Sequence, residues 1–349
     1  MKVSDPECYC GFLKLSLVIP TYNRDCLLPI TIPALASLRT AEGITYEVIF
    51  VDDASSDTTP TLLNEAVLRY PDRFRYIRIA HSGGPGAPRN TGLRAATGDV
   101  IVMIDDDVVP DSDLLLQYAE FHTRYPEQNH AAVGEAYIPE RLRDDPMSWF
   151  HSFPFDKWTN TDNLDYMHFW TCNVSVKREF MLTAGMFDET FLLQDDVYCG
   201  YRLWKNGMQL HLWVGARGEH LYQFKPEGIP AKGVRLGRWH YRFLEEIGWE
   251  RIALINMRVL SYDLPKFILL KRILGRAAFR ILDNPLTMWT LEKLGARTSR
   301  RNRITDTYYA FIYHRNILKG YYEAKRSADA GAPLDLFQLE LQMAKRRKP

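Results

Sequence analysis

Three adjacent aspartates, Asp105, Asp106 and Asp107, directly follow the apolar run Val100–Ile104. Adjacent carboxylates raise one another's pKa and cost stability, whereas a divalent cation that bridges them to phosphate oxygens turns the repulsion into binding. Side chains alternate along an extended chain, so Asp105 and Asp107 are expected on one side and Asp106 on the other. The pattern therefore predicts a D-x-D metal clamp. A solvated acidic turn helped by Pro110 is the alternative interpretation.

Two further acidic pairs stand where an element begins or ends. Asp52 and Asp53 follow the apolar segment 46–51, and Asp195 and Asp196 stand at the expected start of a helix, whose positive end favours carboxylates. The carboxyl ends of parallel strands share one edge of a sheet, so the two strand-end clusters are expected at a common rim. This convergence favours a ligand site over a solvated turn.

The elements that must position these side chains alternate between strands and helices. The apolar patterns predict strands at 15–19, 46–51, 74–79 and 100–104, and helices at 26–39, 59–69 and 89–96. A loop rich in Gly and Pro, 81–88, precedes the last of these helices. The alternation predicts an α/β fold with a Rossmann-like, doubly wound, mostly parallel sheet that binds its ligand at the carboxyl ends of the strands.

Composition and charge narrow the class of protein. The formal net charge of +1 gives no case for nucleic acid as a partner. The five cysteines are scattered without a C-x-x-C pair, which favours reduced thiols and a cytoplasmic location. The first residues lack the apolar segment of a secretory signal, and no stretch reaches the roughly 18 uninterrupted apolar residues of a spanning helix.

Five ordered motifs resemble those of a known family. They occupy residues 17–24, 51–57, 88–93, 105–107 and 195–196. Their order and spacing resemble the family 2 glycosyltransferases with the GT-A fold, over roughly residues 14–222. The resemblance implies a GT-A catalytic domain at 1–222, with a nucleotide-sugar half at 14–110 and an acceptor half at 111–222. A basic helical C-terminal region would follow at 223–349.

The resemblance also implies roles for single residues. It places these residues at the nucleotide sugar: Pro20, Tyr22, Arg24, Asp52, Asp53, Arg89, Asn90, Asp105, Asp106 and Arg202. Asp53 would accept a hydrogen bond from a uracil-type ring, and Asp105 would approach the ribose or the sugar. Asp107 and Asp105 would coordinate Mg²⁺ or Mn²⁺, which neutralises the leaving diphosphate. His220 is a further candidate metal ligand, with a structural histidine as the alternative.

The pair Asp195–Asp196 matches the family's E-D motif, whose second acid commonly acts as the general base. We expect Asp196 to be the base, although the first position is Asp instead of Glu and leaves open which acid reaches the acceptor. Such a base typically contributes about 10²–10⁴-fold in rate. Arg202, six residues after Asp196, would support the acid or reach the diphosphate, and a surface salt bridge is its alternative.

Two segments suggest partners. The aromatic stretch 137–170 would suit a glycan, a lipid-linked glycan or a peptide acceptor, although aromatic residues also fill cores. The segment 265–282 has the pattern of a basic amphipathic helix, and 297–303 and 345–348 are also basic. These segments predict peripheral binding to an anionic membrane at the inner face of the cell membrane. A helix packed on the catalytic domain is the alternative.

The sequence thus predicts an inverting glycosyltransferase that moves a hexose or N-acetylhexosamine from a nucleotide diphosphate sugar, with UDP expected, to a hydroxyl of a glycan or lipid-linked glycan. A non-catalytic nucleotide-sugar or carbohydrate-binding protein is the main alternative. A sugar nucleotidyltransferase fits less well, because residues 20–24 replace its early G-x-G-x-R loop. A dehydrogenase fits least, because residues 83–86 follow a later strand and lack the G-x-G-x-x-G spacing.

Overall fold

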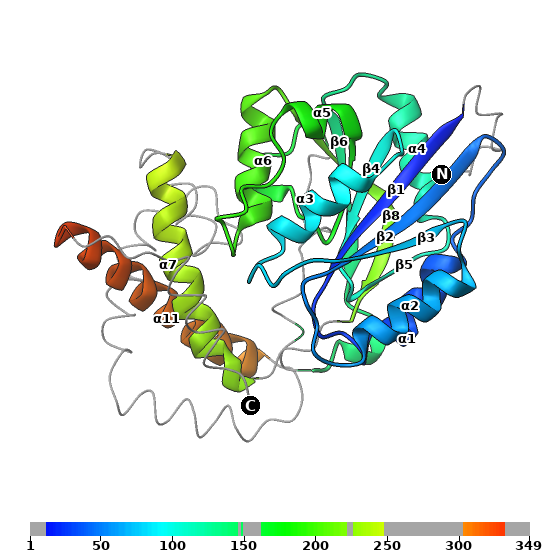
Figure 1. Ribbon diagram of the computed structural model, residues 1–349. Coiled ribbons are helices and arrows are strands. Elements are labelled where there is room, and N and C mark those ends of the chain that lie inside the picture. The colour runs from blue at the N-terminus through cyan, green and yellow to red at the C-terminus, as the bar shows by residue number, and fades with distance from the viewer. Residues whose placement is uncertain (1–11, 146–147, 149–161, 222–225, 248–302, 332–349) are drawn as a thin grey trace. The chain divides into compact units, whose positions relative to one another are not determined.

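The computed structural model describes residues 12–145, 148, 162–221, 226–247 and 303–331 (Figure 1). The chain divides into two compact units. The first comprises Met1–Pro139, His151–Tyr222 and Glu340–Pro349, and the second comprises Glu140–Phe150 and Gln223–Leu339. The described sheet and every predicted site residue belong to the first unit.

The first unit is built on an eight-stranded sheet in the order β3-β2-β1-β4-β7-β6-β8-β5. Its strands are β1 (Leu13–Thr21), β2 (Ile44–Asp52), β3 (Phe74–Arg78), β4 (Val100–Ile104), β5 (Val108–Pro110), β6 (His130–Tyr137), β7 (Asn173–Lys177) and β8 (Gln209–His220). The sheet is mostly parallel. The exceptions are β7, which runs antiparallel between β4 and β6, and β5, which pairs antiparallel with the end of β8.

Helices cover both faces of this sheet (Figure 1). They are α1 (Leu28–Ala36), α2 (Thr59–Arg69), α3 (Gly86–Ala95), α4 (Leu114–Arg124), α5 (Arg178–Thr183) and α6 (Asp195–Lys205), with a short 3₁₀ turn, η4 (Tyr166–His168). Residues of α1, α2 and α4 pack in one hydrophobic cluster, and residues of α3, α5 and α6 pack in a second. The expected α/β fold with two helical layers is confirmed.

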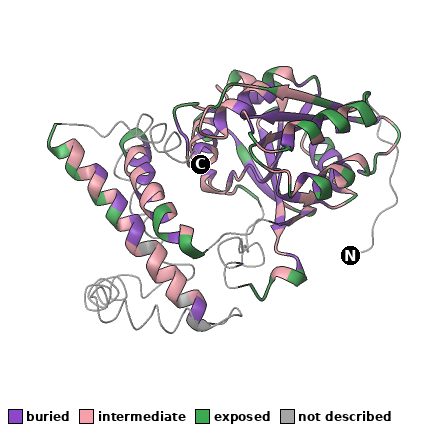
Figure 2. Ribbon diagram, turned by 60° about the horizontal axis from the view of Figure 1, so that its bottom comes forward, coloured by how far each residue is buried: buried purple, intermediate pink, exposed green. Residues whose placement is uncertain are grey.

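Alternation along the strands separates these two clusters. In β4, Val100 and Val102 belong to the first cluster, whereas Ile101 and Met103 belong to the second. Successive side chains of a strand point to opposite faces, so a strand buried on both faces reads as a continuous apolar run. This explains why the runs in the sequence located the strands well. Figure 2 shows the strands buried and the exposed residues concentrated on outer helices and loops.

The boundaries of the first elements agree closely with the sequence. The strand at 100–104 and the helix at 59–69 have the predicted ends. The third helix begins at Gly86, earlier than the expected residue 89. Its Pro88 falls in the first turn, where proline is tolerated because the amide N–H would have no helical partner.

The second unit contains a helix pair, α7 (Ile229–Ile247) and α11 (Arg303–Asp329), with the 3₁₀ turns η1 (Glu140–Leu142) and η5 (Pro226–Gly228). The two helices approach closely at small residues. A Cβ at Gly237 would overlap the backbone of Ile317, and a Cβ at Gly320 would overlap that of Val234. Arg238 also donates to Glu323 at 2.9 Å. Glycine is therefore required where the helices cross.

Several predicted segments lie outside the described residues: the expected amphipathic helix at 265–282, residues 297–302 of the basic segment 297–303, the basic segment 345–348, and residues 149–161 of the aromatic stretch 137–170. Membrane binding and the acceptor role of the aromatic stretch stay predictions. Within the described part of the chain, every helix is too short or too polar to cross a bilayer.

Candidate active site

The parallel register brings the predicted acidic clusters to one rim. Thr21 at the end of β1 pairs with Asp52 at the end of β2, and Val18 pairs with Met103 of β4. The Thr21 hydroxyl donates to Asp106 Oδ2 at 2.7 Å, so the ends of β1 and β4 are directly linked. The common rim expected from the sequence is therefore present.

The three aspartates after β4 do not continue the strand alternation. β4 ends at Ile104 and the chain turns. Asp105 meets Arg89, whereas Asp106 and Asp107 both meet Arg24, with Arg24 Nε 3.0 Å from Asp106 Oδ1 and Nη2 3.9 Å from Asp107 Oδ2. Strand alternation therefore does not by itself place these side chains, and the predicted D-x-D pair of Asp105 and Asp107 stays a prediction.

Asp106 is buried, as Asp107 is. Burial raises the pKa of Asp106 to about 7, although Arg24 and Thr21 favour the charged form, and the neighbouring Asp107 adds to the increase. Its hydrogen bonds to Thr21 and Arg24 attach the turn after β4 to the loop after β1. The structure therefore gives Asp106 an internal contact, and its expected contact with the nucleotide sugar stays a prediction.

Asp107 lies beside His220 because of the short strand that follows it. β5 pairs with β8 so that Val108 lies opposite His220, and the amide of Leu221 donates to the carbonyl of Asp107 at 2.7 Å. This places His220 Nε2 3.4 Å from Asp107 Oδ1, with both side chains largely buried. Residues far apart in the chain thus meet at the rim.

A carboxylate oxygen and an imidazole nitrogen are suitable ligands for an Mn²⁺-like ion, and Mg²⁺ accepts the carboxylate. Within the described ranges, no group of three or more His, Cys, Asp or Glu side chains is arranged to hold a metal by itself. Asp107 and His220 fit a site that also needs oxygens from a phosphate ligand.

Arg89 connects the rim to the second acidic pair. This buried guanidinium donates from Nη1 to Asp195 Oδ2 at 2.7 Å and from Nη2 to Asp105 Oδ1 at 2.9 Å. Burial alone would lower the pKa of Arg89, but the two carboxylates raise it above its usual value. Its guanidinium also lies 5.5 Å from the centre of the Phe187 ring. Both terminal nitrogens of the Arg89 guanidinium therefore donate to carboxylates of the protein.

Asp195 and Asp196 differ in their surroundings at the start of α6. Asp195 is buried and bound to Arg89, whereas Asp196 accepts from the amide of Val197 at 2.8 Å. Burial and the charge of Asp195 raise the pKa of Asp196 to about 7. Gln194, with φ of 60°, starts the helix from a left-handed conformation. Asp195 is therefore held by an arginine, whereas Asp196 has a pKa near neutral pH and a hydrogen bond from the backbone.

Asn90 and Arg202 support the turn that precedes α6. Asn90 exchanges two hydrogen bonds with the backbone of Phe187, with its amide nitrogen 3.0 Å from the carbonyl and its oxygen 2.9 Å from the amide nitrogen. Arg202 donates to the carbonyl of Met186 at 3.2 Å. Binding of the nucleotide sugar by these two residues stays a prediction. The contacts that they make in the structure hold the backbone of residues 186 and 187 in place.

Asp52 is fully buried and organises the loop after β2. Its carboxylate accepts from the amide of Ser55 at 2.8 Å, from the Tyr76 hydroxyl at 3.0 Å and from Arg78 at 2.8 Å. Asn23 ties this loop to the loop after β1, because its side chain accepts from the amide of Ser56 at 2.8 Å. Both oxygens of Asp52 are therefore used inside the protein, beside the neighbouring Asp53.

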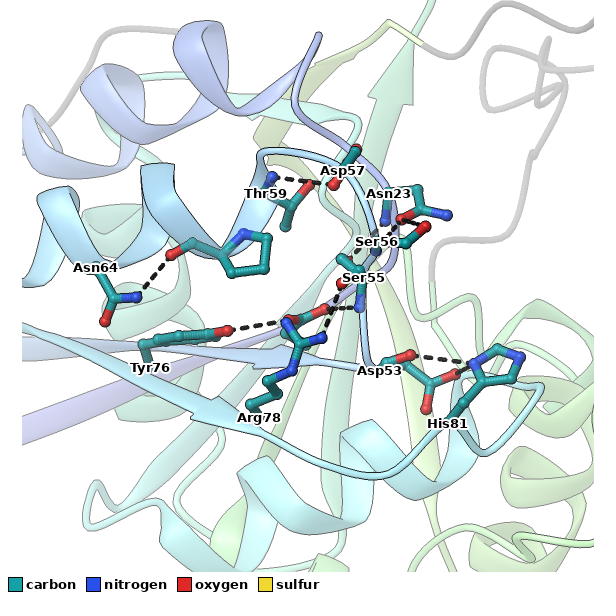
Figure 3. A network of polar contacts seen from close by, with 12 residues as sticks. Asn23, Asp53, Ser55, Ser56, Asp57, Thr59, Asn64, Tyr76, Arg78 and His81 are labelled. Carbon is teal, nitrogen blue, oxygen red and sulfur yellow. Dashed lines mark hydrogen bonds and ion pairs between the residues drawn. The ribbon is translucent and has the colours of Figure 1, made fainter. Parts of the chain in front are cut away.

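Asp53, Tyr22 and His81 form a second, more open group. Asp53 accepts from the amides of Ser82 at 2.6 Å and Gly83 at 3.3 Å, and burial raises its pKa. His81 Nδ1 lies 2.9 Å from Asp53 Oδ2 (Figure 3). The His81 ring stacks on Tyr22, with 4.8 Å between ring centres. Pro20, in β1, pairs with Val51 of the adjacent strand.

His81 was missed as an individual residue by the sequence reasoning, which treated it as part of a loop. Its position after β3 would have been a signal only together with the knowledge that β3 lies next to β2, where Asp53 follows. Thr21 was missed for the same reason, since its partner Asp106 is distant in the chain.

Two family descriptions match this chain. "Glycosyl transferase family 2" matches residues 16–182, and "Glycosyl transferase family group 2" matches residues 100–291, which is more than half of the chain. The chain therefore belongs to the family 2 glycosyltransferases.

The chain is similar to parts of several longer curated proteins. The validoxylamine A glucosyltransferase of Streptomyces hygroscopicus subsp. limoneus is 30% identical over 273 residues, which are 67% of this chain and 58% of the relative. The chondroitin synthase of Escherichia coli is 28% identical over 304 residues, 73% of this chain and 43% of the relative. The poly(ribitol-phosphate) beta-glucosyltransferase of Bacillus spizizenii is 37% identical over 109 residues, which are 31% of this chain and 17% of the relative. The chain thus spans less than two thirds of each of these relatives.

Solved structures share the fold. The mannosyltransferase PcManGT from Pyrobaculum calidifontis, in complex with GDP-Man and Mn²⁺, has a TM-score of 0.54 and 17% identity, and the match covers 90% of this chain and 88% of that one. S. aureus TarS 1-349 in complex with UDP has a TM-score of 0.50 and 17% identity, covering 89% and 92%. Similarity at this identity shows the fold alone, and it confirms the expected GT-A fold.

Proposed function

We propose that this chain is an inverting glycosyltransferase that moves a hexose or N-acetylhexosamine from a nucleotide diphosphate sugar to a hydroxyl of a glycan or lipid-linked glycan. The observation that carries the proposal is the link made by Arg89 between Asp105, at the rim where a metal is proposed to bind, and Asp195, next to Asp196. This link supports the proposal because it joins Asp105, a proposed donor-binding residue, to the acidic pair that contains the proposed base.

The proposed site for the sugar donor has two parts, one for the nucleobase and one for the diphosphate with its metal ion. The exposed ring of Tyr22 offers a stacking surface, and the buried carboxylate of Asp53 offers an acceptor for the N–H of a nucleobase. Asp107 and His220 would hold Mg²⁺ or Mn²⁺. That ion, when bound with the diphosphate, would neutralise the negative charge that develops on the leaving group. UDP is the proposed nucleotide.

Asp196 would act as the general base. Its carboxylate takes the proton of the acceptor hydroxyl while that oxygen bonds to the anomeric carbon and the bond from this carbon to the diphosphate oxygen breaks. A single displacement of this kind inverts the anomeric configuration. A pKa near 7 suits the step, since a base works best when its pKa lies near the operating pH. Arg89 holds Asp195 by direct hydrogen bonding and so fixes the start of α6.

Calorimetric titration tests the donor half directly. Wild-type protein is titrated with UDP, GDP and dTDP, each with and without Mn²⁺. We expect one nucleotide to bind in a metal-dependent manner and the Asp107→Asn variant to bind it at least about tenfold more weakly, because one metal ligand is lost. Asp72→Asn, at an exposed position, is the matched control and should bind as the wild type does.

Failure to bind any of the three nucleotides would contradict the proposed donor class. Metal-independent binding that Asp107→Asn leaves unchanged would instead contradict the proposed metal ligands.

A further inference from the structure

The imidazole of His81 has two well-defined contacts next to the donor rim. Nδ1 lies 2.9 Å from Asp53 Oδ2 and 3.1 Å from the Asp53 carbonyl oxygen. Both neighbours are hydrogen-bond acceptors, so Nδ1 must carry the proton and donate. The same ring stacks on Tyr22 with an angle of 28° between the planes.

These are the two contacts that the proposed function requires of a nucleobase: an aromatic ring on Tyr22 and a ring N–H that donates to Asp53. We propose that His81 is an internal ligand of the nucleobase site, which it occupies until a nucleotide displaces it. The inference rests on the donor half of the proposed function, and it adds a competitor that the chain itself supplies.

The surroundings of His81 allow its side chain to leave. The side chain is 34% exposed, and it belongs to the loop between β3 and α3, in which Gly83 has φ of 82°. A left-handed glycine next to the Ser82 amide lets this loop turn tightly around the Asp53 carboxylate.

Asp53 would stay oriented after His81 leaves. Its carboxylate also accepts from the amides of Ser82 and Gly83, and neither bond depends on the imidazole. Departure of His81 therefore uncovers the face of the Tyr22 ring on which it stacks and frees an acceptor position on Asp53 Oδ2 at the same time. The nucleobase would enter a preformed site.

An internal competitor reduces the apparent affinity for the nucleotide by the fraction of molecules in which the site is open. Removing one exposed hydrogen bond and one stacking contact predicts a gain in apparent affinity of about fivefold to tenfold. We therefore expect His81→Ala to bind UDP about fivefold to tenfold more tightly than the wild type in calorimetric titration with Mn²⁺.

Two controls identify the origin of the effect. His81→Phe keeps a ring that can stack on Tyr22 but cannot donate to Asp53, so it should gain less affinity than His81→Ala. Inorganic pyrophosphate has no base, so both variants should bind it as the wild type does. Thermal unfolding of each variant verifies that it is folded.

Unchanged UDP affinity in His81→Ala would overturn the inference, as would weaker binding, which would make His81 a wall that contacts the bound base. An equal gain for pyrophosphate would also overturn it, because the effect would not concern the base. If neither wild type nor variants bind UDP, GDP or dTDP, the proposed function fails and this inference fails with it.

Discussion

Buried carboxylates at the two ends of the sheet's strands have pKa values shifted in opposite directions. Near the amino-terminal edge, Glu47 Oε1 accepts from the Ser16 hydroxyl at 2.8 Å and from the amide and hydroxyl of Thr97 at 2.8 and 2.7 Å. Burial raises the pKa of Glu47, but these bonds outweigh it and lower the value to about 2. At the carboxyl-terminal rim, burial and neighbouring carboxylates raise the pKa of Asp106 and Asp196 to about 7.

The difference lies in the balance of donors and charges. Around Glu47, three hydroxyl or amide donors and the nearby Arg75 and Lys14 serve one carboxylate. At the rim, Arg24 and Arg89 serve several carboxylates, so charge repulsion remains. The amino edge therefore stabilises the sheet, whereas the rim retains carboxylates with raised pKa, a property that is common at functional sites.

The largest expected effect comes from Asp196→Asn. Loss of the base should reduce turnover by about 10²–10⁴-fold while donor binding persists. The same change should increase the free energy of unfolding by about 1–2 kcal/mol at pH 7 without metal, because a carboxylate whose pKa is raised destabilises the ionised native state. Turnover assays and urea unfolding measure both.

Asp72→Asn, at an exposed site, is the control for Asp196→Asn. Unchanged turnover in Asp196→Asn would contradict the base assignment, whereas a wild type that binds nucleotide sugar without any turnover would favour a non-catalytic sugar-binding protein. A loss of stability in the same variant would contradict the contrast between the two edges.

Arg89→Met tests whether the link across the rim is required for the fold. The change leaves Asp105 and Asp195 facing each other without their shared cation, which should reduce the free energy of unfolding by about 3–5 kcal/mol. Arg94→Met is the matched control on the same helix, since Arg94 is exposed and lies 3.6 Å from Glu189. It should change stability by less than about 0.5 kcal/mol. Equal effects of the two variants in urea unfolding would disprove the special role of Arg89.

Glu47→Gln gives the smallest expected effect and a dependence on pH. The pKa of Glu47 is about 2 in the folded protein against an ordinary value of 4.5. Its stabilisation, on the order of 3 kcal/mol, is therefore complete above the ordinary value and is lost as the pH falls from about 4.5 toward 2. Urea unfolding at pH 7 and pH 3 should show a difference between wild type and Glu47→Gln that shrinks in acid.

Glu42→Gln is the control for Glu47→Gln, because Glu42 is exposed and lies two residues before β2 begins. A constant difference between wild type and Glu47→Gln at both pH values would contradict the lowered pKa.

The parts of the fold that depend on local pattern were predictable. The apolar runs located β1 to β4 because a strand buried on both faces needs a continuous apolar sequence. The position of the acidic residues at strand ends then indicated the rim. The arrangement beyond β4 was not predictable in this way, because β5 has three residues and β8 contains polar residues and an irregularity in its pairing with β6.

Residue by residue, the sequence determined which chemical groups the site has: the carboxylates after β2 and β4, the acidic pair at the start of α6 and the arginine of α3. The tertiary structure alone decided their partners. Arg89 bridges Asp105 and Asp195, His220 lies against Asp107, and His81 reaches Asp53 because β-strand pairing and helix packing bring together residues separated by up to 113 positions. Side-chain type is a local property, whereas the distance between charges, which sets their pKa, depends on the whole chain.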